Sequence, residues 1–405
     1  MLLPKPSHAL RAALLFVLVA GPIYLYPPLI YEQSDEKTIH IPVVAKFAAE
    51  LPLPRIDDYG AAFGPLYHVA LSPLWRAGVH ETRVFAAITL LLSTIGVVVL
   101  FRLFEQLAAP DDALASALVV GWSPYYLGPA VYFASDNPAF IASVLAIGPW
   151  LAGARLATLS ATCWSVAACL IRQSFLWMAP IFVLEAARQR RWGLLLAAAA
   201  PAILVAGLVV LWGGLTPPAY AVHRAAPGPG PILYFLATLG LWSVPLFPAF
   251  FAAAARRRSA LVIIPVAAVA LYVWPVGAGL DSSMWGGALR SFSKPFGAIA
   301  GSPALFWVFV PLGAATMALW IGAARSRVEK RMLAVLALWL AAQTFNAFTL
   351  DKYYQPIALF AIVVMATQAG RYARIGRWAL LALVLLASVL RLVVHGHRMT
   401  TQWGI

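Results

Sequence analysis

Apolar segments long enough to cross a lipid bilayer recur along the whole chain. Hydrophobic residues make up 62% of its 405 residues, and charged residues only 11%. A soluble domain carries about 25% charged residues, and a transmembrane helix needs about 20 apolar ones. A single soluble fold is therefore excluded, and the sequence predicts an all-α polytopic membrane protein forming a single integral membrane domain over residues 1–405. About thirteen segments are its expected transmembrane helices: 10–30, 84–104, 113–131, 138–154, 156–171, 173–187, 193–213, 230–254, 259–279, 305–324, 332–350, 355–370 and 376–394.

The basic residues indicate which side of the membrane each loop faces. Lys and Arg number 29, against 15 Asp and Glu. With the N-terminus in the cytoplasm, the arginine-rich turns at 188–191 and 256–258 both fall inside, as the positive-inside rule requires. We therefore read the excess positive charge as cytoplasmic anchoring beside membrane lipids, and not as nucleic-acid binding.

This orientation places a long acidic loop, residues 31–83, outside the membrane. If its chain is helical after Ser34, Glu36 and His40 lie one turn apart on one face. A carboxylate next to an apolar boundary ionises less readily, which makes it a better base near neutral pH. The alternative that these acids only solvate a loop stays open. We expect residues 61–77 to form a half-buried juxtamembrane helix.

Other polar side chains fall near the predicted outer ends of the spans. Ionisable residues at membrane depth are costly, so they mark functional sites by default. Each also has a structural alternative, such as capping a helix for Asp136 or anchoring at the interface for Arg172 and Lys352. The positive side chains of Arg172 and Lys352 are suited to binding a phosphate group. The polar residues that we single out near the outer ends of the spans are Asp136, Arg172, Gln173, Lys352 and Tyr353.

Short motifs in the outer loops resemble the dolichyl-phosphoglucose α-1,2-glucosyltransferase family, a branch of the GT-C glycosyltransferases. That family carries a stretch like E-P-Y-M-D-E-I-F-H-I-P, followed by W-D-P, P-G-L-Y, a Y-x-x-D type loop, R-Q-T and a D-N-R-H-Y type loop. The similar residues recur in the same order over residues 31–354. They are Glu32, His40, Ile41, Pro42, Lys46, Phe47, Asp57, Leu66, Tyr67, Tyr132, Asp136, Arg172, Gln173, Ser174, Asp351, Lys352, Tyr353 and Tyr354.

One departure from the family pattern leaves the identity of the base open. A gapless alignment places Glu36 at the family's Asp and Lys37 at its Glu. A one-residue insertion instead aligns Asp35 and Glu36 with the family's Asp-Glu pair. We take Glu36 as the expected base and Asp35 as the second choice.

The resemblance implies a GT-C-like fold and an inverting transfer of a hexose, with glucose expected, from a polyprenyl-phosphate donor. The base would deprotonate a hydroxyl of a glycan or lipid-linked acceptor, which attacks the anomeric carbon opposite the phosphate. No cofactor is expected to be required. A divalent metal, which helps some GT-C relatives, would need Glu36, Asp57 and Asp136 to converge. We expect the remaining residues to bind substrate: His40, Asp57, Asp136, Arg172, Gln173, Lys352 and Tyr353.

Two other function classes stay open. A transporter or flippase of a lipid-linked glycan precursor predicts an inverted repeat with broken helices around midplane charges, and the sequence contains no such repeat. A non-catalytic scaffold would tolerate the loss of Glu36. Abundant Ala and Arg indicate a GC-rich bacterial gene, hence an inner-membrane protein whose site faces the periplasm. In a eukaryote the site would face the lumen of the ER.

Overall fold

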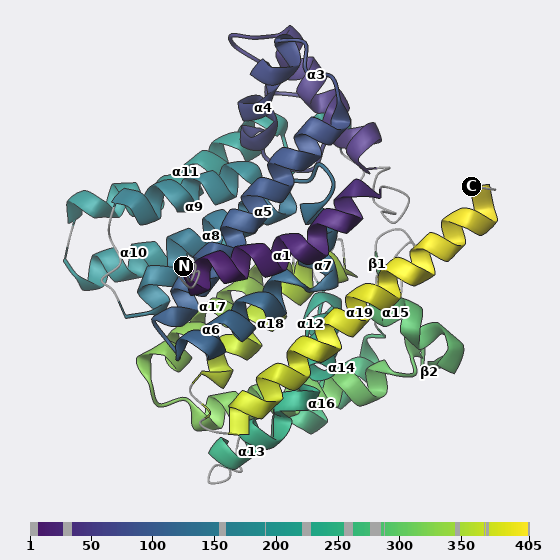
Figure 1. Cartoon of the computed structure of the whole chain (residues 1–405). Coiled ribbons are helices and arrows are strands. Elements are labelled where there is room, and N and C mark those ends of the chain that lie inside the picture. The colour runs from purple at the N-terminus through teal and green to yellow at the C-terminus, as the bar shows by residue number, and fades with distance from the viewer. Residues whose placement is uncertain are drawn as a thin grey trace, which may run out of the picture. The chain divides into compact units, whose positions relative to one another are not determined.

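A computed structural model describes residues 7–26, 35–153, 159–190, 192–220, 228–254, 262–275, 285–286, 288–344, 349–367, 369 and 372–403. This part of the chain is helical apart from turns and four two-residue strands (Figure 1), so the predicted all-α class is confirmed. The chain divides into two compact units. Unit 1 comprises Met1–Leu103, Tyr126–Arg224 and Val389–Ile405, and unit 2 comprises Phe104–Tyr125 and Ala225–Ser388. A single integral membrane domain stays a prediction.

Unit 1 holds the acidic loop and the helices around it. Three short helical segments separate its longer helices: the π-helix η2 (Glu36–His40) and the 3₁₀ turns η3 (Gln173–Met178) and η4 (Pro218–Tyr220). The α-helices assigned wholly or mainly to this unit are α1 (His8–Leu25), α3 (Ile41–Ala49), α4 (Leu66–Arg76), α5 (Thr82–Glu105), α7 (Pro124–Ala130), α8 (Asp136–Leu151), α9 (Leu159–Ile171), α10 (Ala179–Arg188) and α11 (Trp192–Trp212). Within the segment 61–77, expected to be a half-buried helix, α4 covers Leu66–Arg76, and one face of it is buried.

Unit 2 is built mainly of helices, with short strands in its loops. Its strands pair as β1 (Trp285–Gly286) with β4 (Thr349–Leu350), in parallel, and β2 (Ala298–Ile299) with β3 (Ser302–Pro303), antiparallel. Its helical segments are α6 (Pro110–Gly121), α12 (Gly230–Ser243), η5 (Val244–Leu246), α13 (Phe247–Ala254), α14 (Ile263–Val273), α15 (Ala288–Ser293), η7 (Lys294–Phe296), α16 (Phe306–Ala323), α17 (Arg327–Gln343), α18 (Asp351–Ala366) and most of α19 (Tyr372–Trp403).

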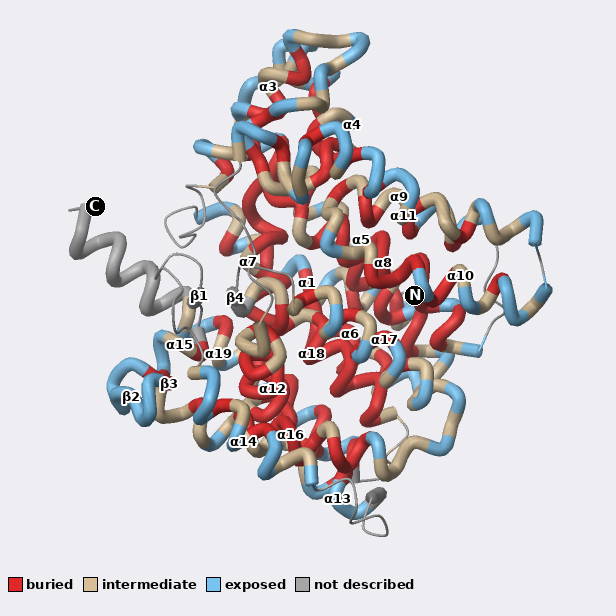
Figure 2. Tube along the Cα trace, turned by 180° about the vertical axis from the view of Figure 1, so that it is seen from behind, coloured by how far each residue is buried: buried red, intermediate tan, exposed pale blue. Residues whose placement is uncertain are grey.

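Helices α12 and α16 approach each other closely at two glycines. A Cβ atom on Gly240 would overlap the carbonyl oxygen of Phe309, and one on Gly313 would overlap that of Leu236. Small residues at such positions let two helix backbones touch, which is typical of helix pairs in membranes. Figure 2 shows α12 as almost wholly buried.

Six helices in the described part of the chain are long and apolar enough to cross a membrane, which corrects the prediction of thirteen. This indicates an integral membrane protein. The six coincide with predicted segments and are His8–Leu25, Thr82–Glu105, Trp192–Trp212, Gly230–Ala252, Phe306–Ala323 and Ala373–Arg391. The other predicted segments form shorter or interrupted helices. The segment 113–131, for example, divides into α6 and α7 before Pro124, where a proline interrupts the helical hydrogen bonds.

Large apolar side chains cover the outer faces of several of these helices. On α11, Leu196, Ile203 and Val210 are all exposed, and Leu14 and Leu18 are exposed on α1. Patches of this kind are rare on soluble monomers, where they mark contacts with lipid or with another protein. On helices of membrane-spanning length they fit contact with acyl chains.

Candidate functional site

The π-helix η2 buries a carboxylate in unit 1. Glu36 and His40 are the buried residues of this turn, as their predicted shared face requires, and the Ile41 N–H bonds the Glu36 carbonyl. The Glu36 Oε1 atom accepts a hydrogen bond of 3.3 Å from the backbone N–H of Phe133. Burial raises the pKa of Glu36 to about 6, although this hydrogen bond and the charge of Lys37 oppose the rise. Glu36 is therefore a buried acid that titrates close to neutral pH.

Two histidines meet beside this turn. The Nδ1 atom of His40 lies 2.9 Å from the Nε2 atom of His68, which α4 supplies, and both side chains are buried. The two rings are inclined by only 6°. The Phe63 ring stacks on both of them, and the Phe133 ring lies 5.3 Å from His40 between centroids. Phe133 thus contacts Glu36 through its backbone and His40 through its ring.

An ion pair borders the histidines. Arg172 lies where α9 ends and η3 begins, and its backbone is extended there. One of its terminal nitrogens is 2.7 Å from the carboxylate of Asp136, the first residue of α8. The guanidinium also lies over the Phe63 ring, 5.3 Å from its centroid. A ring on one side and a carboxylate at the edge fix the orientation of this planar cation.

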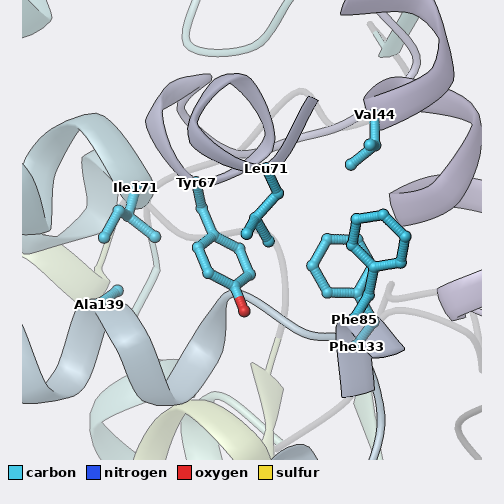
Figure 3. Packing of buried hydrophobic residues seen from close by; sticks show 7 residues of the cluster. All are labelled: Val44, Tyr67, Leu71, Phe85, Phe133, Ala139 and Ile171. Atoms are coloured by element: carbon cyan, nitrogen blue, oxygen red, sulfur yellow. The ribbon is translucent and has the colours of Figure 1, made fainter. Parts of the chain in front are cut away.

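A cluster of buried apolar side chains packs against the site. Figure 3 shows Tyr67 and Leu71 of α4 facing the rings of Phe85 and Phe133. The Tyr67 hydroxyl bonds the side chain of Thr89 on α5 at 2.9 Å. The cluster packs Phe133, whose N–H binds Glu36, among residues of five helices, α3, α4, α5, α8 and α9. Its members are Val44, Tyr67, Leu71, Phe85, Phe133, Ala139 and Ile171.

The segment 51–65, which carries Phe63, is tied down through its own backbone carbonyls. Gln173 donates to the Ala62 carbonyl at 2.6 Å and also to the Leu215 carbonyl at 3.0 Å. The Trp212 indole donates to the Ile56 carbonyl at 2.8 Å. These bonds come from η3 and α11, so the segment is held by elements far away in the sequence.

The structure brings some of the predicted site residues together and leaves others apart. Glu36, His40, Asp136 and Arg172 form one connected cluster, and Gln173 holds the segment next to it. Asp35 is half-buried at the start of the π-helix. Asp57 lies in an exposed ion pair with Arg55 at 2.9 Å.

Lys352 and Tyr353 belong to unit 2, where the Lys352 ammonium lies 5.6 Å from the centre of the Tyr353 ring. Glu32 lies outside the described residues. Among the residues that are described, no three His, Cys, Asp or Glu side chains are grouped to hold a metal. The three acids named for such a site, Glu36, Asp57 and Asp136, do not converge.

Sequence reasoning missed three members of the cluster: Phe63, His68 and Phe133. His68 was visible only as a polar residue within the apolar segment 61–77. Its partner is 28 residues away along the chain, and no local spacing predicts that contact. Phe133 binds Glu36 through its backbone N–H, which has no sequence signal at all.

Taken together, unit 1 provides a buried carboxylate, a buried histidine pair and an oriented guanidinium. A carboxylate of raised pKa can accept a proton near neutral pH, and an oriented guanidinium can stabilise a negatively charged leaving group.

Comparison with protein-family models, with curated proteins and with solved structures finds no match to this chain.

Proposed function

We propose that this chain is a membrane glycosyltransferase of the GT-C type, which transfers a hexose, glucose first, from a polyprenyl-phosphate donor to a glycan or lipid-linked acceptor with inversion. The observation that carries the proposal is the burial of Glu36 beside the histidine pair, in the loop where the family's acidic motif is found. Most carboxylates of a solvating loop stay exposed, because burying an unpaired charge is costly. An inverting transfer needs a carboxylate as its base, and the buried Glu36 can serve in that role.

In the proposed step, Glu36 takes the proton of the acceptor hydroxyl while that oxygen attacks the anomeric carbon. The bond from this carbon to the phosphate oxygen breaks, and polyprenyl phosphate leaves with the electron pair. Arg172 balances the charge that develops on the phosphate. No cofactor takes part in this step.

The π-helix favours one of the two alignments of the base. A π-helical turn spans five residues between hydrogen-bonded groups where an α-helical turn spans four, so it accommodates one additional residue. The alignment with a one-residue insertion places Asp35 and Glu36 on the family's Asp-Glu pair. Of these two, Glu36 is the buried one. Its burial supports Glu36 as the base in either alignment.

The alternative function, a transporter or flippase of a lipid-linked precursor, has one observation in its favour. The helical path is interrupted at Arg172, between α9 and η3, next to a charge pair. Interrupted helices at charged sites are common in transporters. We rank this function second because Glu36 and the histidines lie on the loop between two long apolar helices and not within one of them.

Membranes that contain the full chain would be supplied with radiolabelled polyprenyl-phosphate-glucose and a lipid and glycan extract. Glu36→Gln should lower transfer by a factor of about 100 or more, because it removes the base. Asp35→Asn should keep most of the activity. Glu50→Gln, which changes a carboxylate of the same loop in an ion pair with Lys46, is the matched control.

Loss in the Asp35 variant alone would overturn the assignment of Glu36. Equal activity in every variant would show that none of the three substituted carboxylates is the base. If the wild-type chain transfers no sugar from any of a panel of lipid-linked donors but moves them across a vesicle bilayer, the transporter function replaces the proposal.

A further inference from the structure

The His40–His68 pair defines a proton arrangement that has consequences for the site. A hydrogen bond between two neutral imidazoles carries one proton, so one ring donates and the other accepts. The rings are nearly coplanar and their nitrogens are 2.9 Å apart, which is suitable geometry for such a bond. Which ring donates depends on the surroundings of the remaining nitrogens.

The second nitrogen of His68 decides the direction. Its Nδ1 atom is buried and has no hydrogen-bond partner among the described residues. A proton on this atom would be an unsatisfied buried donor, which is rarely found in proteins. If the atom is unprotonated, the single proton of His68 is on Nε2 and points at His40.

The surroundings of His68 keep its ring neutral. Arg172 acts on it from the α9–η3 junction, and its positive charge disfavours a second proton on the ring. Tyr67, the neighbour on its own helix, directs its hydroxyl to Thr89. His40 is the remaining titratable group in contact. Burial and the charge of Arg172 lower the pKa of His68 to about 3, so it is neutral at physiological pH.

We infer that His68 is a positioning residue that holds His40 as the neutral tautomer protonated on Nε2, so that His40 acts in the site as a hydrogen-bond donor and not as a base. His68 donates from Nε2 to the Nδ1 atom of His40, which leaves the proton of His40 on its own Nε2. His68 itself has no exposed surface, so it acts through His40. The ligand class suited to such a donor is an oxygen atom of a hydroxyl or phosphate group. This last consequence rests on the proposed function, whereas the tautomer does not.

The tautomer can be measured without any activity. The full chain, labelled with ¹⁵N-histidine and reconstituted in lipid nanodiscs, would be studied by NMR at neutral pH. His40→Gln and His68→Gln variants assign the two rings. We expect protons on the Nε2 atoms of both rings and bare Nδ1 atoms. A proton on Nδ1 of His40, or a doubly protonated His40, would overturn the inference.

A pair of substitutions separates positioning from packing. His68→Gln keeps an amide N–H near the position of Nε2, whereas His68→Phe keeps the stacked ring without a donor. If His68 acts by positioning, transfer falls about tenfold or more in His68→Phe and is largely restored in His68→Gln. A packing role gives the opposite order, since Phe preserves the aromatic stack. If wild-type protein transfers no sugar, the NMR result still decides the tautomer while the proposed function fails.

Discussion

The Asp136 carboxylate lies 2.7 Å from the Arg172 guanidinium, and these side chains expose only 12% and 11% of their surface. Breaking such a pair leaves a charge that is buried and uncompensated. We therefore expect Asp136→Asn to lower the free energy of unfolding by about 3–5 kcal/mol. Denaturant unfolding of the purified protein in detergent micelles measures this change.

The exposed pair between Arg55 and Asp57 provides the matched control for this ion pair. Asp57→Asn makes the same chemical change at a solvated site, so no measurable loss of stability is expected. The double variant Asp136→Ala/Arg172→Met should recover much of the lost stability, because no lone charge remains. Equal losses at Asp57 and Asp136 would contradict the buried pair.

Glu36 makes stability depend on pH in a stated direction. Its pKa is about 6 in the folded chain, against an ordinary value of 4.5. The folded state therefore binds the proton more tightly, and the free energy of unfolding falls as pH rises from about 4.5 to about 6 and stays lower above that range. Glu36→Gln removes this cost. Allowing for solvent screening, we expect the variant to be more stable than wild type by about 1 kcal/mol above pH 7 and equal to it near pH 4.

Unfolding curves of the two proteins across this pH range test the prediction. Glu50→Gln is again the control, since Glu50 is partly exposed and paired with Lys46. A Glu36→Gln protein that is less stable than wild type at high pH would mean that the ionised carboxylate is stabilised where it lies.

The contact between α12 and α16 predicts a difference between two glycines. A methyl group on Gly240 has no room, because it would overlap the Phe309 carbonyl, whereas one on Gly207 of α11 meets nothing within 4 Å. We expect Gly240→Ala to destabilise the protein by about 1–3 kcal/mol or more, through displacement of two helix backbones. Gly207→Ala should be neutral or slightly stabilising, since Ala favours helix. Thermal unfolding in the same detergent compares them, and similar melting temperatures would refute the close packing.

The ties on the segment 51–65 predict its resistance to protease. Gln173→Leu removes the donor that bonds the Ala62 and Leu215 carbonyls, so the segment should open more often. Trypsin should then cleave after the exposed Arg55 several times faster, as followed by mass spectrometry. Gln189→Leu, which removes a side-chain bond on the surface of α10, should leave the rate unchanged. Faster cleavage in both variants would indicate general loosening.

Local spacing predicted the parts of the site that depend on neighbours in sequence. Glu36 and His40 are four residues apart and share the buried face of one helical turn, as expected. The six longest apolar helices were also evident, since length and apolar content decide them. The number of spans was wrong because an apolar segment does not reveal where its helix ends, as the break before Pro124 within the predicted segment 113–131 illustrates. Burial depends on distant elements, so the exposure of Asp57 and the pairing of His68 were beyond sequence reasoning.

Four of the bonds that restrain the segment 51–65 reach main-chain oxygen atoms, those of Leu51, Arg55, Ile56 and Ala62. Bonds to main-chain oxygens do not depend on which side chains the segment exposes to its surroundings. One such side chain is Leu53, which is 84% exposed. The backbone path of this segment therefore depends little on its exposed side chains. Outward-facing residues such as Leu53 can be exchanged for an epitope, a fluorophore or a new recognition sequence, provided that the buried Tyr59 and Ala61 and the stacked Phe63 are kept.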